Sequence, residues 1–123
     1  MKPTIILLMT VDPAVEAVAR EVVTSLRHGL RTAHNAPEAF QELGECSNDI
    51  DAAIVDLDPG MHGAALLEAA GDQFPVIALT SLEANYMAPV ASRHGAQECL
   101  TKPLDAGHLK AALKRVLAGV VGR

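Results

Sequence analysis

Apolar runs of strand length recur along this chain, and each ends at a polar or turn-forming residue. The run at 4–9 is almost unbroken, and the runs at 52–55 and 75–79 are similarly apolar. A strand covered on both faces shows such a continuous pattern, whereas a strand with one wet face alternates. The sequence therefore predicts buried strands in these three places, with two shorter strands at 30–34 and 98–101.

Helical periodicity follows the first strand. Asp12-Pro13 combines an N-cap acid with a proline suited to the first helical position. Apolar residues then recur at three- and four-residue steps, and Gly29 ends the pattern. These apolar positions are Val15, Val18, Val22 and Leu26.

Similar signals predict the other helices. A second helix is expected from Asn35, with Phe40 and Leu43 facing inward, and a third over about 63–72. The pattern over 82–93 is weak because Pro89 interrupts it, so a short, irregular or mobile fourth helix is expected there. Asp105 is expected to cap a last helix whose apolar face comprises Leu109, Leu113, Val116 and Leu117.

Strands and helices thus alternate from one end of the chain to the other. This order implies right-handed crossovers and a doubly wound α/β fold, a five-stranded parallel sheet with helices on both faces. The 123 residues suffice for one domain, expected over 1–118, followed by a short tail over 119–123.

Composition narrows the functional classes. The net charge is −5, and no basic stripe of the kind that tracks phosphates is present, so nucleic acid is not expected as a direct partner. No signal-peptide pattern and no apolar run of about 18 residues occur, which favours a cytoplasmic protein without a membrane partner. The chain is expected to be either a stand-alone domain or part of a longer protein.

Three groups with complementary chemistry stand at strand ends. Asp56 follows the third strand, Thr80 the fourth and Lys102 the fifth. Doubly wound sheets gather functional groups at these carboxyl ends. A carboxylate, a hydroxyl and an ammonium suit the reception of a phosphoryl group, with Asp56 as nucleophile and the other two binding phosphate oxygens. The plainer alternative is that Asp56 is a strand-end acid that Lys102 neutralises in an inert pocket.

Other chemistries find little support in the sequence. No glycine-rich phosphate loop follows the first strand, and no nucleophile-elbow motif occurs, which argues against an unrelated α/β enzyme or nucleotide-binding protein. Cys46, Cys99 and the five histidines lack metal-ligand spacing and are expected to be ordinary side chains.

Taken in order and spacing, these motifs resemble the receiver domain of response regulators, the module of two-component signalling. The likeness covers essentially the whole chain and implies a flavodoxin-like sheet with strand order 2-1-3-4-5. It is carried by Ile6-Leu7-Leu8, Asp12-Pro13, Asp56 with Pro59-Gly60-Met61-His62-Gly63, Leu79-Thr80-Ser81, His94-Gly95-Ala96 and Thr101-Lys102-Pro103-Leu104.

The resemblance implies a function and partners. In that family an aspartate after the third strand accepts a phosphoryl group in a phosphorelay, and here this implies Asp56 as acceptor, Thr80 as switch hydroxyl and Lys102 as the family's lysine. The implied partners are a histidine kinase or phosphotransfer protein and an output protein or domain. A homodimer through the fourth-helix to fifth-helix face, 85–94 and 108–115, is a further candidate. The domain itself is not expected to be an enzyme.

The first departure from the family concerns Mg²⁺. The family holds this ion largely with an acidic pair directly after the first strand, where this chain has Thr10-Val11. The nearest acid, Asp12, comes one position late. Because side chains alternate along a strand, a shift of one residue would point the Asp12 side chain to the opposite side of the sheet. The candidate metal ligands are therefore Asp56 and Asp12, and weak or absent Mg²⁺ binding is expected.

Two further departures affect the loop after the third strand and the output switch. Pro59 follows Asp56 by three positions instead of the family's four, and Asp58 is a candidate to supply an oxygen there. Cys99 stands where the family commonly has an aromatic residue that changes rotamer. The alternative hypothesis is therefore a pseudo-receiver, a phosphorylation-independent protein-binding or dimerisation module.

Overall fold

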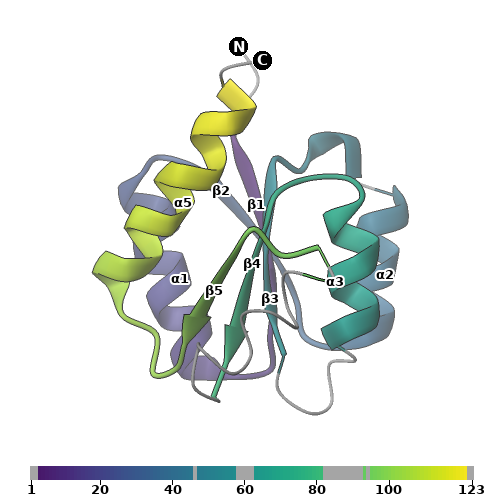
Figure 1. The fold of residues 1–123 in the computed structure, drawn as a ribbon, viewed down its shortest axis with the longest axis horizontal. Coiled ribbons are helices and arrows are strands. Elements are labelled where there is room, and N and C mark those ends of the chain that lie inside the picture. The colour runs from purple at the N-terminus through teal and green to yellow at the C-terminus, as the bar shows by residue number, and fades with distance from the viewer. Residues whose placement is uncertain (1–2, 46, 58–62, 82–92, 94, 122–123) are drawn as a thin grey trace.

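Five parallel strands form the centre of the protein. The computed structural model describes residues 3–45, 47–57, 63–81, 93 and 95–121. The strands lie in the order β2-β1-β3-β4-β5, which confirms the predicted sheet (Figure 1). Their bounds are β1 Ile5–Met9, β2 Gly29–Ala33, β3 Ala52–Asp56, β4 Val76–Thr80 and β5 Glu98–Thr101.

The strand register brings the carboxyl ends together at one edge of the sheet. Met9 of β1 pairs with Val55 of β3, and Asp56 pairs with Leu79 of β4. Thr80 in turn pairs with Thr101 of β5. The residues that follow β1 and β5, and the last residues of β3 and β4, therefore lie along the same edge.

The described part of the chain contains four α-helices and one short 3₁₀ helix, and all but the last helix, α5, connect strands. Asp12 caps α1, because its side chain accepts a hydrogen bond from the Ala14 amide and Pro13 occupies the first turn. Asp105 caps α5 in the same way, through a bond of 2.9 Å from the His108 amide. The helices are α1 Pro13–Ser25, α2 Ala36–Glu45, η1 Ser47–Asp49, α3 Gly63–Gly71 and α5 Ala106–Val121.

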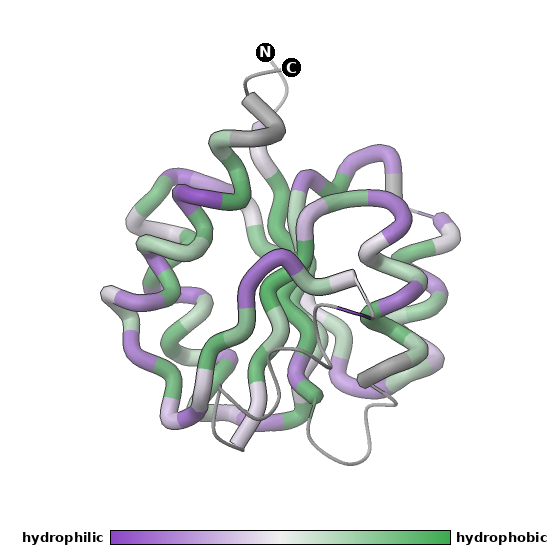
Figure 2. Tube along the Cα trace, in the orientation of Figure 1, coloured by the Kyte–Doolittle hydropathy of each residue, from purple (hydrophilic) through white to green (hydrophobic). Residues whose placement is uncertain are grey.

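The helices cover the two faces of the sheet as separate layers. Helices α1 and α5 lie on one face, and α2 and α3 lie on the other (Figure 1). Successive strand residues face opposite layers, so Ile6 and Leu8 pack with α1 and α5, whereas Leu7 and Met9 pack with α2 and α3. The hydropathy colouring shows the sheet as the most apolar part of the molecule (Figure 2).

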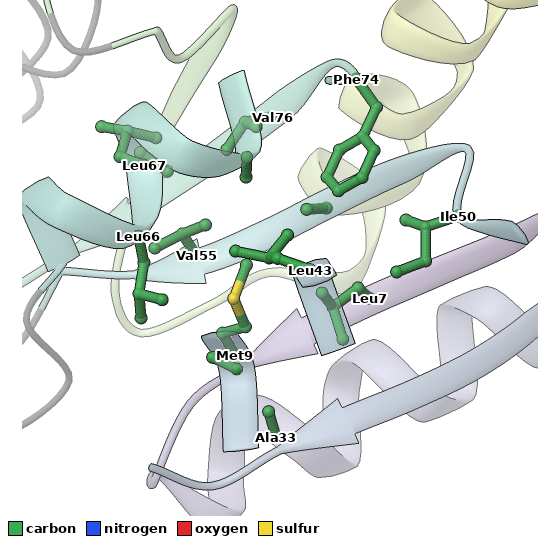
Figure 3. Packing of buried hydrophobic residues seen from close by; sticks show 14 of the residues in the cluster. Leu7, Met9, Ala33, Leu43, Ile50, Val55, Leu66, Leu67, Phe74 and Val76 are labelled. Atoms are coloured by element: carbon green, nitrogen blue, oxygen red, sulfur yellow. The ribbon is translucent and has the colours of Figure 1, made fainter. Parts of the chain in front are cut away.

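The core of the α2–α3 layer is built mainly from aliphatic side chains. Leu43 of α2, Leu66 and Leu67 of α3, and Val55 of β3 meet there, with Phe74 at one end (Figure 3). The residues of β3 and β4 are all buried. This explains their unbroken apolar sequence, and it leaves polar chemistry only at the strand ends.

Helix α2 turns a different side to the sheet than the sequence predicted. Phe40 was expected to face inward, but it is 43% exposed, and Leu43, Ala39 and Ala36 form the buried side of α2 instead. The small alanines allow α2 to lie close to the sheet, and Phe40 falls outside their stripe. The predicted fourth helix lies almost wholly outside the described residues.

Among the described helices, none combines the length and the apolarity that crossing a bilayer requires. Helix α5 continues to Val121, past the predicted boundary at residue 118. That boundary stays a prediction.

A close backbone contact between α3 and the segment before β5 gives a test of the fold. A Cβ at Gly71 would lie 3.0 Å from the Cα and from the carbonyl oxygen of Gly95, whose φ is +110°. Since backbone cannot yield as a side-chain tip does, Gly71→Ala should lower the free energy of unfolding by about 1–3 kcal/mol. The measurement is urea denaturation.

Gly44 of α2 provides the matched control, because a Cβ there meets nothing within 4 Å. Gly44→Ala should raise the free energy of unfolding by about 0.5–1 kcal/mol through helix propensity. Equal effects of the two substitutions would contradict the close packing of Gly71 on Gly95.

Candidate functional site

The structure brings Asp56 and Lys102 into direct contact at the carboxyl edge of the sheet. The Lys102 Nζ atom lies 3.2 Å from Asp56 Oδ1 and 3.1 Å from Oδ2. Asp56 has no exposed surface, and the Lys102 side chain is 10% exposed. A buried carboxylate is tolerated only with a compensating charge and hydrogen bonds, and Lys102 supplies both.

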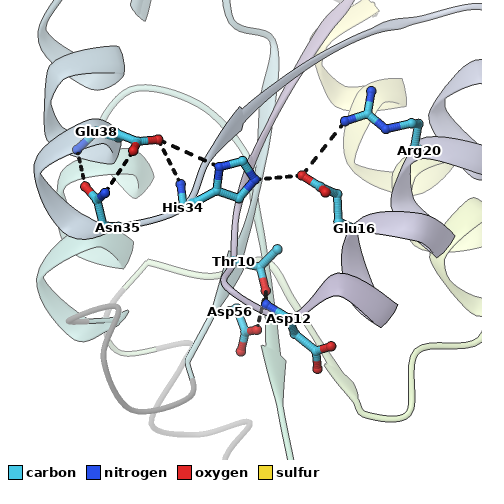
Figure 4. A network of polar contacts seen from close by, with 8 residues as sticks. All are labelled: Thr10, Asp12, Glu16, Arg20, His34, Asn35, Glu38 and Asp56. Atoms are coloured by element: carbon cyan, nitrogen blue, oxygen red, sulfur yellow. Dashed lines mark hydrogen bonds and ion pairs between the residues drawn. The ribbon is translucent and has the colours of Figure 1, made fainter.

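A second donor to Asp56 comes from the residue directly after β1. The Thr10 hydroxyl donates a hydrogen bond of 2.6 Å to Asp56 Oδ2, and Thr10 is itself buried (Figure 4). Its oxygen also accepts a bond of 3.0 Å from the Asp12 amide. Thr10 thus uses its proton on the carboxylate and one lone pair on the backbone.

Strand register explains why Thr10 reaches Asp56. Leu8 of β1 pairs with Ile54 of β3, and both face the α1–α5 layer. Two positions further along each strand, Thr10 and Asp56 point toward that same side. From sequence, Thr10 was noted only as the residue that replaces an acid after the first strand. Its contact with Asp56 was missed, although the register of two adjacent strands is the signal that predicts it.

Asp12 joins the pocket from the first turn of α1. Its Oδ1 accepts a 2.9 Å bond from the Ala14 amide, and its Oδ2 lies 3.4 Å from Lys102 Nζ. These contacts stabilise the ionised carboxylate and lower the pKa of Asp12, the Ala14 amide having the largest effect and the Lys102 ammonium adding to it. Because the chain turns into the helix here, the alternation of β1 no longer directs this side chain away from the site.

Thr80 stands at the same edge, at the end of β4. It is buried, and its carbonyl accepts a 2.7 Å hydrogen bond from the Lys102 amide. This backbone contact places the start of the segment after β5, including the cis Lys102–Pro103 peptide bond, beside the end of β4. All three residues proposed from sequence therefore lie at the ends of neighbouring strands.

The donor set of this pocket does not fit a Mg²⁺ ion. Mg²⁺ requires an octahedral set of hard oxygens, usually including one or two carboxylates with open coordination positions. Here an ammonium lies within hydrogen-bonding distance of both Asp56 and Asp12, and Thr10 offers a donated proton where the resemblance to receiver domains implies a carboxylate. Within the described residues, no three acidic, histidine or cysteine side chains gather in a metal-binding group. Asp58 lies outside those residues.

A second polar network lies near the pocket on the surface. His34, which follows β2, bonds Glu16 of α1 at 2.8 Å, and Glu16 also pairs with Arg20 (Figure 4). The His34 amide donates to Glu38 of α2 at 3.1 Å. These exposed contacts tie α1 to the start of α2, which agrees with the prediction of ordinary surface histidines.

Cys99 lies in β5, half-buried against the α2–α3 core. Burial raises the pKa of its thiol, which disfavours the reactive thiolate. This agrees with the expectation of an ordinary side chain. Cys46 and His62, also considered from sequence, lie outside the described residues.

The hydrogen bond from Thr10 to Asp56 can be tested by stability. Thr10→Val removes the hydroxyl and leaves a buried carboxylate oxygen with one donor fewer, so the free energy of unfolding should fall by about 2 kcal/mol. Thr10→Ser keeps the hydroxyl and should lose no more than about 1 kcal/mol. Chemical denaturation of the three proteins compares them, and similar losses for Val and Ser would contradict a stabilising role of the hydroxyl.

The lowered pKa of Asp12 predicts a pH dependence. A carboxylate whose folded pKa lies below its ordinary value of 3.8 stabilises the fold fully above that pH, and this stabilisation disappears as the pH falls through the folded pKa. Asp12→Asn retains a capping oxygen but no charge. The difference in unfolding free energy between wild type and Asp12→Asn should therefore shrink below pH 3.8. A difference that stays constant from neutral to acid pH would contradict it.

Solved structures with this fold include several receiver domains. A response regulator from Thermotoga maritima superposes with a TM-score of 0.83 at 17% identity, covering 94% of this chain and 98% of that one. A response regulator receiver domain from Clostridium thermocellum gives 0.81 at 24% identity, with 94% of each chain covered. The beryllofluoride-activated receiver domain of RstA from Klebsiella pneumoniae gives 0.78 at 20% identity, covering 93% of this chain and 98% of that one. At these identities the likeness establishes the fold.

The sequence itself settles the family. A comparison with curated proteins found no match. The model of the response regulator receiver domain matches residues 6–114, which include Thr10, Asp12, Asp56, Thr80 and Lys102. Because that match spans most of the 123 residues, the chain belongs to the response regulator receiver domain family.

Proposed function

We propose that this receiver domain accepts a phosphoryl group on Asp56, with Lys102 and Thr80 binding the phosphoryl oxygens. Receiver domains are signalling modules of phosphorelays and are generally not enzymes. The observation that supports the assignment is the contact of Lys102 Nζ with both carboxylate oxygens of Asp56 at the edge where β3, β4 and β5 end.

The proposed transfer step follows from these contacts. One carboxylate oxygen of Asp56 attacks the phosphorus of a phosphohistidine on a histidine kinase or phosphotransfer protein. The new O–P bond forms as the P–N bond breaks, and the imidazole leaves with the electron pair and takes up a proton from solvent. Lys102 is placed to offset the negative charge that gathers on the transferred oxygens.

The buried state of Asp56 sets a condition on this step. With no exposed surface, the carboxylate meets a donor only after neighbouring residues move. Thr10 and Lys102 also hold its oxygens by hydrogen bonds, which lowers their nucleophilicity. We therefore expect slow phosphorylation by small donors, and faster phosphorylation by a cognate partner that opens the pocket.

A second candidate function is a phosphorylation-independent binding module. The same two donors favour it, because Asp56 is already neutralised and hydrogen-bonded without a phosphoryl group. The homodimer face proposed from sequence would serve either function. Its 108–115 half lies on α5, whereas the 85–94 half, apart from Arg93, lies outside the described residues. We also propose that the protein is cytoplasmic.

Incubation with acetyl phosphate tests the acceptor, with parallel samples in Mg²⁺ and in chelator. Intact-mass spectrometry should show one phosphoryl group on the wild type and none on Asp56→Asn, which has no carboxylate to attack with. Asp49→Asn, at an exposed position of η1, is the matched control and should behave as wild type.

Two results would count against the acceptor role. Phosphorylation of Asp56→Asn to the wild-type extent would show that another residue is the acceptor. A wild type that gains no phosphoryl group from acetyl phosphate or from phosphohistidine donors, with an unchanged amide spectrum along α5, would favour the binding module.

A further inference from the structure

The positive charge in this pocket belongs to the chain itself. Lys102 Nζ lies within 3.4 Å of three carboxylate oxygens, both from Asp56 and one from Asp12. It is thus placed between the two acids that could otherwise share a divalent cation. The Lys102 side chain is 10% exposed and Asp56 is buried, so solvent screens their contact little, whereas the Asp12 side chain is 37% exposed and its contact with Lys102 is screened more.

Thr10 adds a neutral hydrogen-bond donor to the same carboxylate. An acid in its position would add a second negative charge next to the buried Asp56 and would require a divalent cation for balance. Thr10 instead donates its proton to Asp56 Oδ2 at 2.6 Å. This neutral donor stabilises the carboxylate and adds no charge that needs compensation.

We infer that Lys102 and Thr10 replace Mg²⁺ as the resident partners of Asp56, so that the unphosphorylated pocket is complete without a divalent cation. The inference rests on the proposed function only in placing the functional pocket at Asp56. It concerns the cofactor requirement of that pocket, which membership of the family leaves open.

The energetics favour this arrangement over metal binding. Among the described residues, two carboxylates and one ammonium leave a single net negative charge in the pocket, and a divalent ion would have to enter beside the ammonium. Its binding to Asp12 would compete with the Lys102 contact and with the helix cap on Ala14. Its binding to Asp56 would have to displace a hydrogen bond from Thr10 or Lys102.

A Mg²⁺ titration of the chelator-treated, unphosphorylated protein tests the inference. The readout is the amide shift of Leu57, whose amide is fixed on the Leu79 carbonyl beside the pocket, together with the thermal unfolding temperature. NaCl at matched ionic strength separates binding from screening. The wild type should show no saturable change up to tens of millimolar Mg²⁺.

Variants at position 10 show whether Thr10 sets this behaviour. Thr10→Asp adds a carboxylate next to Asp56 and removes the donated proton, so saturable Mg²⁺ binding should appear, at least about tenfold tighter than any wild-type response. The Asn side chain of Thr10→Asn has nearly the same shape as Asp but no charge, so this variant should show no saturable Mg²⁺ binding. If Thr10→Asp does not fold, Lys102→Ala is used instead. Because this variant lacks the ammonium that opposes the metal ion, Mg²⁺ should raise its unfolding temperature.

Several outcomes would overturn the inference. Saturable Mg²⁺ binding by wild type that Asp56→Asn abolishes would show a working metal site. If neither Thr10→Asp nor Lys102→Ala bound Mg²⁺, Thr10 and Lys102 would not be the residues that exclude the ion. Acetyl phosphate is absent from this titration, so the two experiments are independent. If Asp56 were not phosphorylated, the proposed function would be wrong, but the result on Mg²⁺ binding would still hold.

Discussion

A carboxylate buried at the end of a central strand is the constraint to which the rest of the site responds. Asp56 has no exposed surface, and an isolated ionised carboxylate in such a place is strongly disfavoured. In the described part of the chain, the ammonium of Lys102 and the hydroxyl of Thr10 compensate for this burial. Removing Lys102 would leave the charge of Asp56 uncompensated, and removing the Thr10 hydroxyl would leave one of its oxygens with one donor fewer. The stability of the fold and the state of the site are therefore coupled through these contacts.

The central strands β3 and β4 favour this pocket because their polar side chains, Asp56 and Thr80, stand only at the carboxyl ends. Every residue of β3 and β4 is buried, and the two helix layers fill both faces with aliphatic side chains. Parallel register then aligns the last residues of these strands with the segments that follow β1 and β5. Charged and hydroxyl side chains from distant parts of the sequence meet there, within hydrogen-bonding distance.

Asp12 links this pocket to the first helix. One of its oxygens caps α1, and the other lies near the ammonium that also holds Asp56. A change in the charge on Asp56 therefore alters the balance of Lys102 between two acids, one of which belongs to a helix terminus. This gives a physical route from the proposed acceptor to α1, beside the surface contacts that join α1 to α2 through His34.

The sequence by itself determined the fold and the positions of Asp56, Thr80 and Lys102, because continuous apolar runs, helix caps and strand-end polar residues are local signals. It also showed the missing acid at Thr10. Phe40 was assigned to the wrong side of α2, since periodicity alone does not say which of several apolar stripes meets the sheet. Only the tertiary structure decided that Thr10 donates to Asp56 and that Lys102 lies between Asp56 and Asp12. These contacts join residues 46 and 90 positions apart, and they depend on strand register and on the turn into α1.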